Sequence, residues 1–378
     1  MKKIIYVVCL TAIVTGLISC GNSAVTLEEV QKEIMLHPGN SFISSPGITV
    51  LHNPDQSTSL ALYDKERHSL AFFDTYGTEL QNIILQLPDS LKSKIQTLYA
   101  QAISADSILL LEKGTKTIFL FNAKGELMRT FIAATNLSDG SNDYCLLAMN
   151  QCPFRYDGEN IYATCTRLDM IVRTPEARKK YFSTPPDIVT NIATGKQNNS
   201  GIWPAEYKSG ASFRDFYPQR CINRKKEIVY GFAASDSIYV LKNGKLISKH
   251  NCKSKYMTER HTYPDDSLGH FFFLEKYSIT EPVYVNLIYD PYRNFYYRIV
   301  HHAIPFENKN GFTVNTFSDK VWSLMLLNED FEVLNEISFD PHQHLPAVFP
   351  TTEGVLVKRN PGENSHGNIS FALFKIIE

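Results

Sequence analysis

Two close pairs of histidines have spacings that could bind a metal ion. His342 and His344 are separated by one residue, so their imidazoles could reach one ion from a loop or from one face of a strand. His301 and His302 are adjacent, and adjacent side chains on a strand point to opposite faces. Neither pair has a third ligand close by in the sequence. We therefore expect no metal and no cofactor, and we interpret the histidines as structural.

The sequence has none of the common local signatures of catalysis. It contains no Gly-x-Ser-x-Gly elbow, no glycine-rich phosphate loop, no His-Glu-x-x-His and no dinucleotide fingerprint. The paired carboxylates of a glycosidase could come from distant parts of the chain and would then leave no local pattern. We predict no catalytic residue, and hydrolysis of a glycan or an ester stays open as an alternative function.

The N-terminus has the order of an export signal. Two lysines precede the uncharged apolar run Ile4–Ile18, which is too short to span a bilayer comfortably. The run leads into Leu17-Ile18-Ser19-Cys20, which resembles the lipobox of bacterial lipoproteins, where the cysteine is acylated. The alternative is a cleaved secretory peptide in which Cys20 has no special role. We expect residues 1–19 to be a signal peptide and residues 20–40 to be a lipid anchor and tether.

Acylation of Cys20 would attach the protein to a membrane, because several acyl chains buried in the bilayer form a stable anchor. Gly21 follows the cysteine in place of an aspartate, and the resemblance to Gram-negative sorting signals then favours the outer membrane. The sequence leaves open whether the protein faces the periplasm or the medium. Without Lys2 and Lys3 the chain has 36 basic and 39 acidic residues, so binding to nucleic acid through charge is excluded.

Five further cysteines remain after the signal and the lipidation site, namely Cys145, Cys152, Cys165, Cys221 and Cys252. An exported compartment permits disulfides, but five cysteines allow at most two bridges and one free thiol. No Cys-x-x-Cys pair occurs, which disfavours a zinc ribbon or a thioredoxin-like redox site. We expect buried free thiols that pack as small hydrophobic groups.

Four residues are candidates for ligand binding. Trp203 lies in the turn Gly201-Ile202-Trp203-Pro204, within a proline-rich and aromatic stretch that also includes Tyr217. Rigid aromatic rings stack on sugars or anchor peptides. Tyr292 and Arg298 belong to the segment Tyr289–Arg298, where the arginine could bind an anion in a central funnel. The alternative for all four is structural: the rings pack between sheets, and Arg298 pairs with a neighbouring carboxylate.

These candidates must be positioned by short strands. Thr26-Leu27-Glu28-Glu29 has capping-box spacing and predicts one short helix. Beyond Pro38 the apolar residues alternate in runs of four to eight residues, rich in β-branched and aromatic types and separated by Gly, Asn, Asp and Pro. This texture predicts an all-β fold.

An internal repeat indicates the architecture. The segment 59–77 aligns without a gap on 107–125, a shift of 48 residues, and each copy reads as strand, turn, strand and glycine turn. Such meanders are typical of β-propeller blades. We predict a propeller over residues 41–378, with six blades favoured, seven possible, and an insertion around 168–220. Ring closure should pair Ile369–Ile377 with a strand near Phe42–Leu51. A sandwich or barrel is the alternative.

The chain resembles bacterial outer-membrane lipoproteins that carry a six-bladed, TolB-like propeller and form a family of unknown function. The resemblance rests on the lipobox, on the repeated hairpins and on Tyr289-Asp290-Pro291-Tyr292-Arg293-Asn294-Phe295-Tyr296-Tyr297-Arg298. It implies an anchored propeller but brings no catalytic residues. Three functions stay open: a module that binds a glycan, peptide or protein, which we favour; an architectural component of the envelope; and a hydrolase acting in the funnel.

Overall fold

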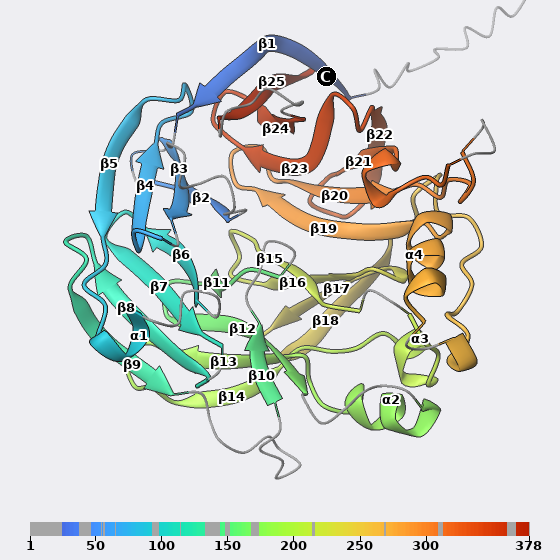
Figure 1. The fold of residues 1–378 in the computed structure, drawn as a ribbon, viewed down its shortest axis with the longest axis horizontal. Helices are drawn as coiled ribbons and strands as arrows, with labels where there is room; N and C mark the ends of the chain where they lie inside the picture. Colours follow the sequence, from blue (N-terminus) through green and yellow to red (C-terminus); the bar gives the residue numbers. More distant parts are fainter. Residues whose placement is uncertain are drawn as a thin grey trace, which may run out of the picture.

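The computed structural model describes residues 25–37, 47–53, 55, 57–64, 66–92, 98–113, 115–132, 144–147, 152–167, 174–213, 216–267, 270–308, 313–360 and 368–377. Its strands form six antiparallel sheets arranged in a ring around a central axis (Figure 1). The fold is therefore a six-bladed β-propeller, as the repeat predicts. We number the blades 1 to 6 in the order of their innermost strands.

Each blade is a meander in which the first strand lies next to the axis. Blade 1 contains β2 (Ile48–His52), β3 (Thr58–Asp64), β4 (Ser69–Phe73) and β5 (Glu79–Ile84). Blade 2 contains β6 (Leu98–Ser104), β7 (Ser107–Glu112), β8 (Thr117–Asn122) and β9 (Leu127–Ile132). In blade 3, β10 (Tyr144–Leu147) and β11 (Arg155–Tyr156) both pair with β12 (Asn160–Arg167), which β13 (Asp187–Asn191) and β14 (Gln197–Ser200) follow.

The other three blades complete the ring. Blade 4 contains β15 (Gln219–Ile222), β16 (Ile228–Phe232), β17 (Ser235–Lys242) and β18 (Lys245–Asn251). Blade 5 contains β19 (Val283–Asp290), β20 (Phe295–His301), β21 (Trp322–Leu327) and β22 (Val333–Phe339). Blade 6 contains β23 (His344–Pro350), β24 (Val355–Arg359) and β25 (Ile369–Ile377), and its outer strand is β1 (Thr26–Leu36) from the other end of the chain. The short helices are α1 (Asp89–Lys92), α2 (Pro175–Tyr181), α3 (Ala205–Lys208), η3 (Asp265–Ser267), α4 (Phe271–Thr280) and η4 (Phe317–Asp319).

Strand β1 corrects two predictions. The helix expected at Thr26 is a strand, and this strand closes the ring by pairing with β25, from Thr26 opposite Ile377 to Leu36 opposite Ile369. The prediction that a strand near Phe42–Leu51 closes the ring was wrong, because β2 pairs with β3 inside blade 1. The capping-box spacing expresses only local helix propensity, whereas β25 presents an open row of backbone groups that needs a partner. The propeller therefore begins before residue 41.

The 48-residue repeat is confirmed strand by strand. Leu62 lies opposite Ala71 in blade 1, and the equivalent Leu110 lies opposite Phe119 in blade 2. Gly77 and Gly125 occupy the same turn, between the third and fourth strands, with φ of +94° and +74°. A Cβ atom on either glycine would collide with a main-chain carbonyl of the preceding blade's outer strand, at Met35 and at Ile84 respectively. The glycines are therefore required both by the turn and by the packing of one blade on the next.

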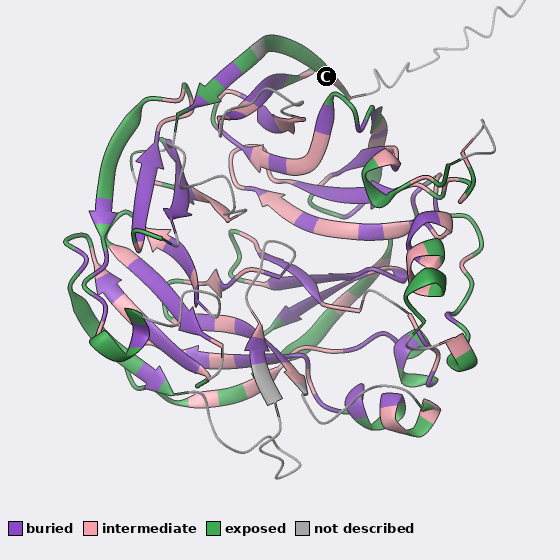
Figure 2. Cartoon of the chain, in the orientation of Figure 1, coloured by how far each residue is buried: buried purple, intermediate pink, exposed green. Residues whose placement is uncertain are grey.

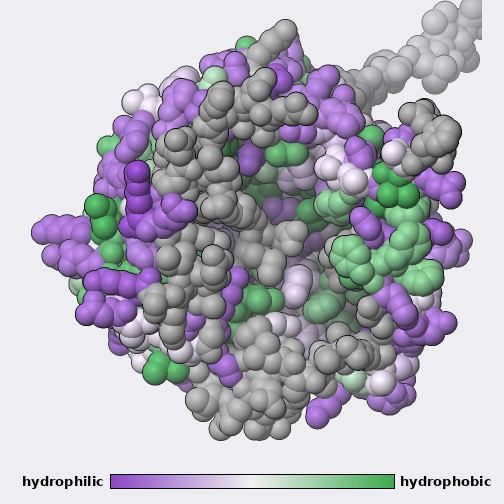
Figure 3. Space-filling view, viewed as in Figure 1, coloured by the Kyte–Doolittle hydropathy of each residue, from purple (hydrophilic) through white to green (hydrophobic). Residues whose placement is uncertain are grey.

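The range 168–220 is only partly an insertion. It supplies β13 and β14 to blade 3 and the start of β15 to blade 4, and its two helices pack in the corner between those blades. The core lies between neighbouring blades, and Figure 2 shows mostly buried middle strands in each blade and a largely exposed outer ring of strands. Hydrophobic surface also gathers over α4 (Figure 3), where Phe271, Phe272 and Phe273 are exposed. In the described part of the chain, no helix is both long and apolar enough to cross a membrane.

Candidate functional site

The central channel contains a cavity of about 470 Å³ that residues of all six blades line. Its walls come from the innermost strands, because these strands surround the axis. The lining reaches the turns that follow the innermost strands of blades 3, 4 and 5, at Asp157, Asn223 and Pro291. The cavity therefore has the size of a site for a small ligand.

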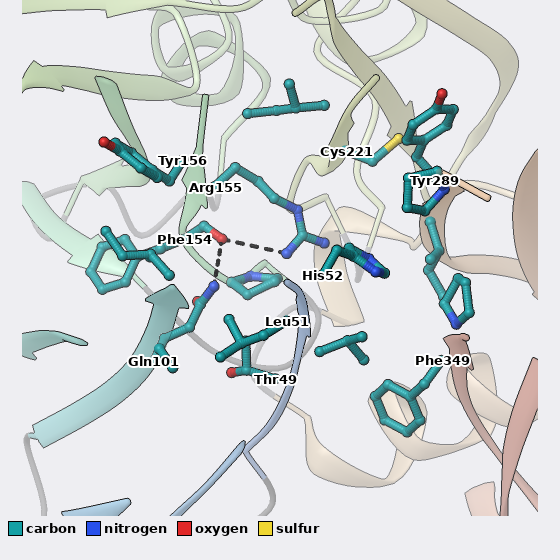
Figure 4. A pocket seen from close by; sticks show the side chains of 18 of the residues that line it. Thr49, Leu51, His52, Gln101, Phe154, Arg155, Tyr156, Cys221, Tyr289 and Phe349 are labelled. Carbon is teal, nitrogen blue, oxygen red and sulfur yellow. Dashed lines mark hydrogen bonds between the residues drawn. The ribbon is translucent and has the colours of Figure 1, made fainter. Parts of the chain in front are cut away.

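Arg155 extends into the middle of this cavity from β11 (Figure 4). Its Nε donates to the main-chain oxygen of Arg220 at 2.8 Å, and its Nη1 donates to the oxygen of Phe154 at 3.4 Å. Among the described residues it forms no ion pair with a carboxylate. Burial lowers the pKa of Arg155, but a guanidinium stays protonated in proteins. A partly buried cation of this kind favours an anion, and its fork matches a carboxylate.

Gln101 lies beside Arg155 on β6. Its Nε2 donates to the same carbonyl oxygen, that of Phe154, at 3.0 Å. Only the amide nitrogen can donate to a carbonyl, so this bond sets the orientation of the amide. The Gln101 nitrogen and Arg155 Nη1 are therefore held around one oxygen atom and form a polar patch on the wall shared by blades 2 and 3 (Figure 4).

The opposite wall of the cavity is apolar. Blades 5, 6 and 1 contribute Ile288, Val348, Phe349 and Leu51. Cys221 lines the blade 4 side, and burial raises the pKa of its thiol to about 12, against the effect of Arg155, so it is a neutral thiol at physiological pH. A ligand with a charged end and an apolar body fits this division.

The turn that follows the innermost strand of blade 4 adds two further cations to the cavity lining. Arg224 and Lys226 line the cavity, and Asp157 is the one carboxylate among its described lining residues. Burial alone would raise the pKa of Asp157, but hydrogen bonds from Asn160, Glu159 and Tyr162 lower it, so this carboxylate is ionised and already bonded. The lining therefore carries a net positive charge.

His52 lies at the edge of the cavity and connects it to Tyr292, one of the residues predicted from the sequence. The Tyr292 hydroxyl lies 2.9 Å from His52 Nδ1 and 2.6 Å from Thr58 Oγ1. Desolvation lowers the pKa of His52, although Asp290 opposes this, so its ring is neutral at physiological pH. Tyr292 therefore orients a lining residue and does not line the cavity itself.

Arg298 does not face the funnel. It lies on β20, the second strand of blade 5, where it is completely buried. Its guanidinium donates to the main-chain oxygens of Phe232, Ser235, Asp236 and Cys252, and its Cζ lies 3.3 Å from the centre of the Tyr284 ring. Backbone carbonyls thus hold its charge, and its position is that of a structural residue joining blades 4 and 5.

The aromatic candidates in the range 168–220 pack inward. Trp203 is 4% exposed and donates from Nε1 to the oxygen of Thr184 at 2.7 Å. Its ring lies against Phe182 and Phe232, with centroids 4.9 and 5.6 Å away. Tyr217 is half-buried beside Phe216. The structure does not bring these two rings to the channel, because they fill the corner between blades 3 and 4.

The remaining sequence candidates lie away from the cavity or outside the described residues. Cys20 is not among the described residues. Cys221 and Cys252 are buried free thiols, as expected, and Cys152 and Cys165 are buried too. His301 and His344 are buried on different strands, and within the described ranges no group of three or more metal-binding side chains occurs. Sequence reasoning missed Arg155, whose neighbours Pro153 and Phe154 contain no motif that marks a ligand-binding arginine.

The fold and the cavity together define a six-bladed β-propeller with a cationic pocket in its central channel. Residues 95–338 match DUF4221, a domain of unknown function, and the chain belongs to this family. A crystal structure of a DUF4221 family member from Bacteroides vulgatus is similar, with a TM-score of 0.75 and 21% identity over 94% of this chain and 99% of that one. A putative exported protein from Bacteroides fragilis has a TM-score of 0.51 and 10% identity over 95% of this chain and 97% of that one. No curated protein matches the chain.

Proposed function

We propose that this protein is an envelope-anchored binding module that holds a small anionic ligand in its central channel. The observation that carries the proposal is the guanidinium of Arg155, which lies in the cavity and has no carboxylate partner among the described residues. The side chain is partly buried, and even partial burial of a cation without a counter-ion costs free energy that a bound anion would offset. A bound carboxylate would supply the missing charge and accept two parallel hydrogen bonds.

The described lining has one carboxylate, that of Asp157, and this favours binding over hydrolysis as the function. Glycoside hydrolysis by the usual route requires two carboxyl groups on either side of the scissile bond. In the described lining, Asp157 accepts hydrogen bonds from the main-chain nitrogens of Glu159 and Asn160 at 2.8 and 2.7 Å and from the Tyr162 hydroxyl at 2.9 Å. A carboxylate held in this way stabilises a turn and is a poor proton donor, so the lining supports recognition of an anion.

The proposal is tested by thermal shift and calorimetry on the full-length chain in a mild detergent. The probes are a panel of small carboxylic acids with aliphatic or aromatic bodies, together with their methyl esters. We expect acids to bind and esters to bind weakly, and Arg155→Met should reduce acid affinity about ten- to hundredfold, since a hydrogen-bonded charge contributes about 1.5–3 kcal/mol. Arg67→Met, which removes an exposed arginine outside the lining, is the control. Equal binding of acids and esters, or unchanged binding in Arg155→Met, would contradict the proposal.

The anchor is a second part of the same proposal. We infer that Cys20 is acylated and holds the propeller at the outer membrane, on the evidence of the lipobox-like order of the N-terminus. The main-chain oxygen of Val25 accepts a hydrogen bond from Asn335 of β22 at 2.6 Å, so the chain is attached to the rim of the propeller five residues after Cys20. Five extended residues span at most about 18 Å, which keeps this rim close to the membrane.

Metabolic labelling with an alkyne fatty acid tests the anchor. The wild-type chain should be labelled and should fractionate with outer membranes, and Cys20→Ala should lose the label. Cys9→Ala, which changes a cysteine within the apolar run of the signal, should keep it. Labelling of both Cys20→Ala and the wild type, or of neither, would show that Cys20 is not the acylation site.

A further inference from the structure

We propose that the ligand of the channel is the C-terminal segment of a peptide, with its terminal carboxylate on Arg155 and its preceding residues in a groove between blades 4 and 5. This inference rests on the proposed function and names the ligand class of the same site. Four observations support it: a second cavity that adjoins the first, the position of Arg224 between them, a row of aromatic rings along the groove, and a strained phenylalanine in it.

The groove has a volume of about 360 Å³ and adjoins the channel cavity. Three residues, Asn223, Arg224 and Tyr289, line both spaces. The remaining lining comes from turns and strands of blades 4 and 5 and includes Lys225, Ile247, His250, Tyr296, Glu329 and Phe331. A chain that leaves the channel past Tyr289 would therefore enter this groove directly.

Arg224 lies where the two spaces meet. Its side chain crosses from the turn after β15 in blade 4 to the turn after β19 in blade 5, where Nη2 donates to the main-chain oxygen of Pro291. The side chain is exposed, and this carbonyl is its one hydrogen-bond partner among the described residues. Rotation of an exposed arginine away from a single carbonyl costs little, so Arg224 can give way to a ligand chain and bind one of its carbonyl oxygens.

Aromatic rings form a continuous row along the groove, from Tyr289 of blade 5 to His250 of blade 4. The Tyr289 and Tyr296 centroids are 5.1 Å apart, Tyr296 and Phe331 are stacked at 4.6 Å, and Phe331 and His250 are 4.6 Å apart. Tyr296 and Phe331 are almost completely buried, whereas Tyr289 and His250 are partly exposed. The row thus gives the groove a rigid floor with exposed ring surface at each end, which suits the side chains of an extended peptide.

Phe331 adopts a backbone conformation that its residue type disfavours. Its φ is +65°, and its nitrogen donates to the oxygen of Asn328 at 3.0 Å. Gly125 has the same place in blade 2, where its nitrogen donates to the oxygen of Asn122 at 2.9 Å with φ of +74°. A non-glycine residue in this region costs about 1–2 kcal/mol. Blade 5 therefore places a ring, at a cost in strain, where blade 2 has a glycine, and that ring builds the groove.

The chemistry of the two spaces favours a peptide over an acidic sugar. Every peptide has a carboxylate at its C-terminus, and the apolar wall of Ile288, Val348 and Phe349 fits an apolar terminal side chain. A sugar acid presents hydroxyl groups on all sides, and this wall would leave them unpaired. The groove outside carries charges of both signs, with Lys225 and Glu329 3.9 Å apart and both exposed, so it offers partners to a peptide backbone and to polar side chains.

The experiment uses the full-length chain in a mild detergent and three probes. These are a degenerate pool of N-acetyl hexapeptides with free C-termini, the same pool with C-terminal amides, and a set of N-acetyl amino acids. Bound species are identified by mass spectrometry, and affinities are measured by fluorescence polarisation. We expect the free-acid hexapeptides to be retained, the amides to be lost, and the N-acetyl amino acids to bind at least tenfold more weakly than the selected hexapeptides.

Two matched variants separate the groove from the channel. Ile247 is 52% exposed on outer strand β18 and lines the groove, and Ile84 is 68% exposed on outer strand β5 of blade 1. Ile247→Glu should weaken hexapeptide binding about tenfold and leave the N-acetyl amino acids unaffected, whereas Ile84→Glu should change neither. Both variants alter exposed side chains, so their folding should be unchanged.

The outcomes distinguish this inference from the function on which it rests. If N-acetyl amino acids bind as tightly as hexapeptides, or if Ile247→Glu has no effect, the groove is not part of the site, although the channel still binds acids. In a parallel polarisation assay with a labelled acidic oligosaccharide, such as oligogalacturonate, tighter binding than that of the hexapeptides would overturn the peptide proposal and leave the anion site intact. If no free acid of any kind binds, both proposals are wrong.

Discussion

Arg155 donates a hydrogen bond from Nε to the main-chain oxygen of Arg220, 2.8 Å away, across the boundary between blades 3 and 4. The side chain of Arg220 is fully buried, and its Nη1 lies 3.1 Å from Asp187 Oδ1 and 2.6 Å from Thr164 Oγ1. A buried ion pair between two blades therefore fixes the strand that orients the arginine of the cavity. The position of the candidate ligand-binding group depends on residues that do not line the channel.

Loss of Asp187 should destabilise the protein strongly. Asp187→Ala would leave the Arg220 guanidinium buried without its counter-ion and remove the acceptor of the Tyr230 hydroxyl, so we expect a loss of about 3–5 kcal/mol in the free energy of unfolding. The double variant Asp187→Leu with Arg220→Met should recover most of this loss, because it removes both charges. Urea unfolding followed by tryptophan fluorescence measures both values. A single-variant loss below about 1 kcal/mol would show that the pair is not important for stability.

Arg155→Met should destabilise the protein much less than Arg298→Met. Arg298 satisfies four main-chain carbonyls in the core, so its removal should cost about 3 kcal/mol. Arg155 is partly buried and bonds two carbonyls without a carboxylate partner in the described chain, so its removal should cost at most about 1 kcal/mol. Thermal denaturation of the two variants checks this difference. Equal losses would indicate that Arg155, too, is a structural residue.

Gly125→Ala should be more destabilising than Gly195→Ala. Both glycines have positive φ, +74° and +72°, so both substitutions add about 1 kcal/mol of backbone strain. A Cβ on Gly125 would also collide with the carbonyl of Ile84, whereas a Cβ on Gly195 has no atom within 4 Å. We expect a loss of about 3 kcal/mol for Gly125→Ala, measured by denaturant unfolding. If the two losses were the same, the contact between blades 1 and 2 would not constrain residue 125.

The buried His301 should make the protein less stable in acid. Burial, with a further contribution from Lys320 and His302, lowers its pKa to about 3, and its ring is 3% exposed. The unfolded chain binds a proton at this residue below pH 6.5 and the folded chain does not, so stability falls as pH decreases from 6.5 towards 3. Between pH 7 and pH 5 this residue should account for a loss of about 2 kcal/mol.

The variant His301→Phe tests this dependence. It keeps an aromatic ring against Phe317, whose centroid lies 4.8 Å from that of His301, but removes the titrating group. The difference in unfolding free energy between pH 7 and pH 5 should therefore be about 2 kcal/mol smaller in the variant than in the wild type. An identical pH dependence in the two proteins would mean that folding does not lower the pKa of His301.

The propeller was predictable because its signals are local. Alternation of apolar residues predicts strands within a few positions, and the ungapped 48-residue shift places Leu62 and Leu110 in equivalent strands without knowledge of any distant contact. The helix prediction for Thr26–Leu36 was wrong because it, too, rested on a local signal. Their helix signal is equally local, and the need of β25 for a partner more than three hundred residues away overrides it.

The residues of the candidate site could not be predicted in the same way, because they depend on which strand of each blade faces the axis. Arg155 and Arg298 are both arginines in strand segments, and nothing in their immediate sequence separates them. Arg155 lies on an innermost strand and reaches the channel, whereas Arg298 lies on the second strand of blade 5 and is surrounded by carbonyls of blade 4. Local sequence patterns predicted the repeat, the candidate lipidation signal and the strands other than β1 in outline. Only the closed ring decided which side chains face the cavity, because that depends on contacts between blades far apart along the chain.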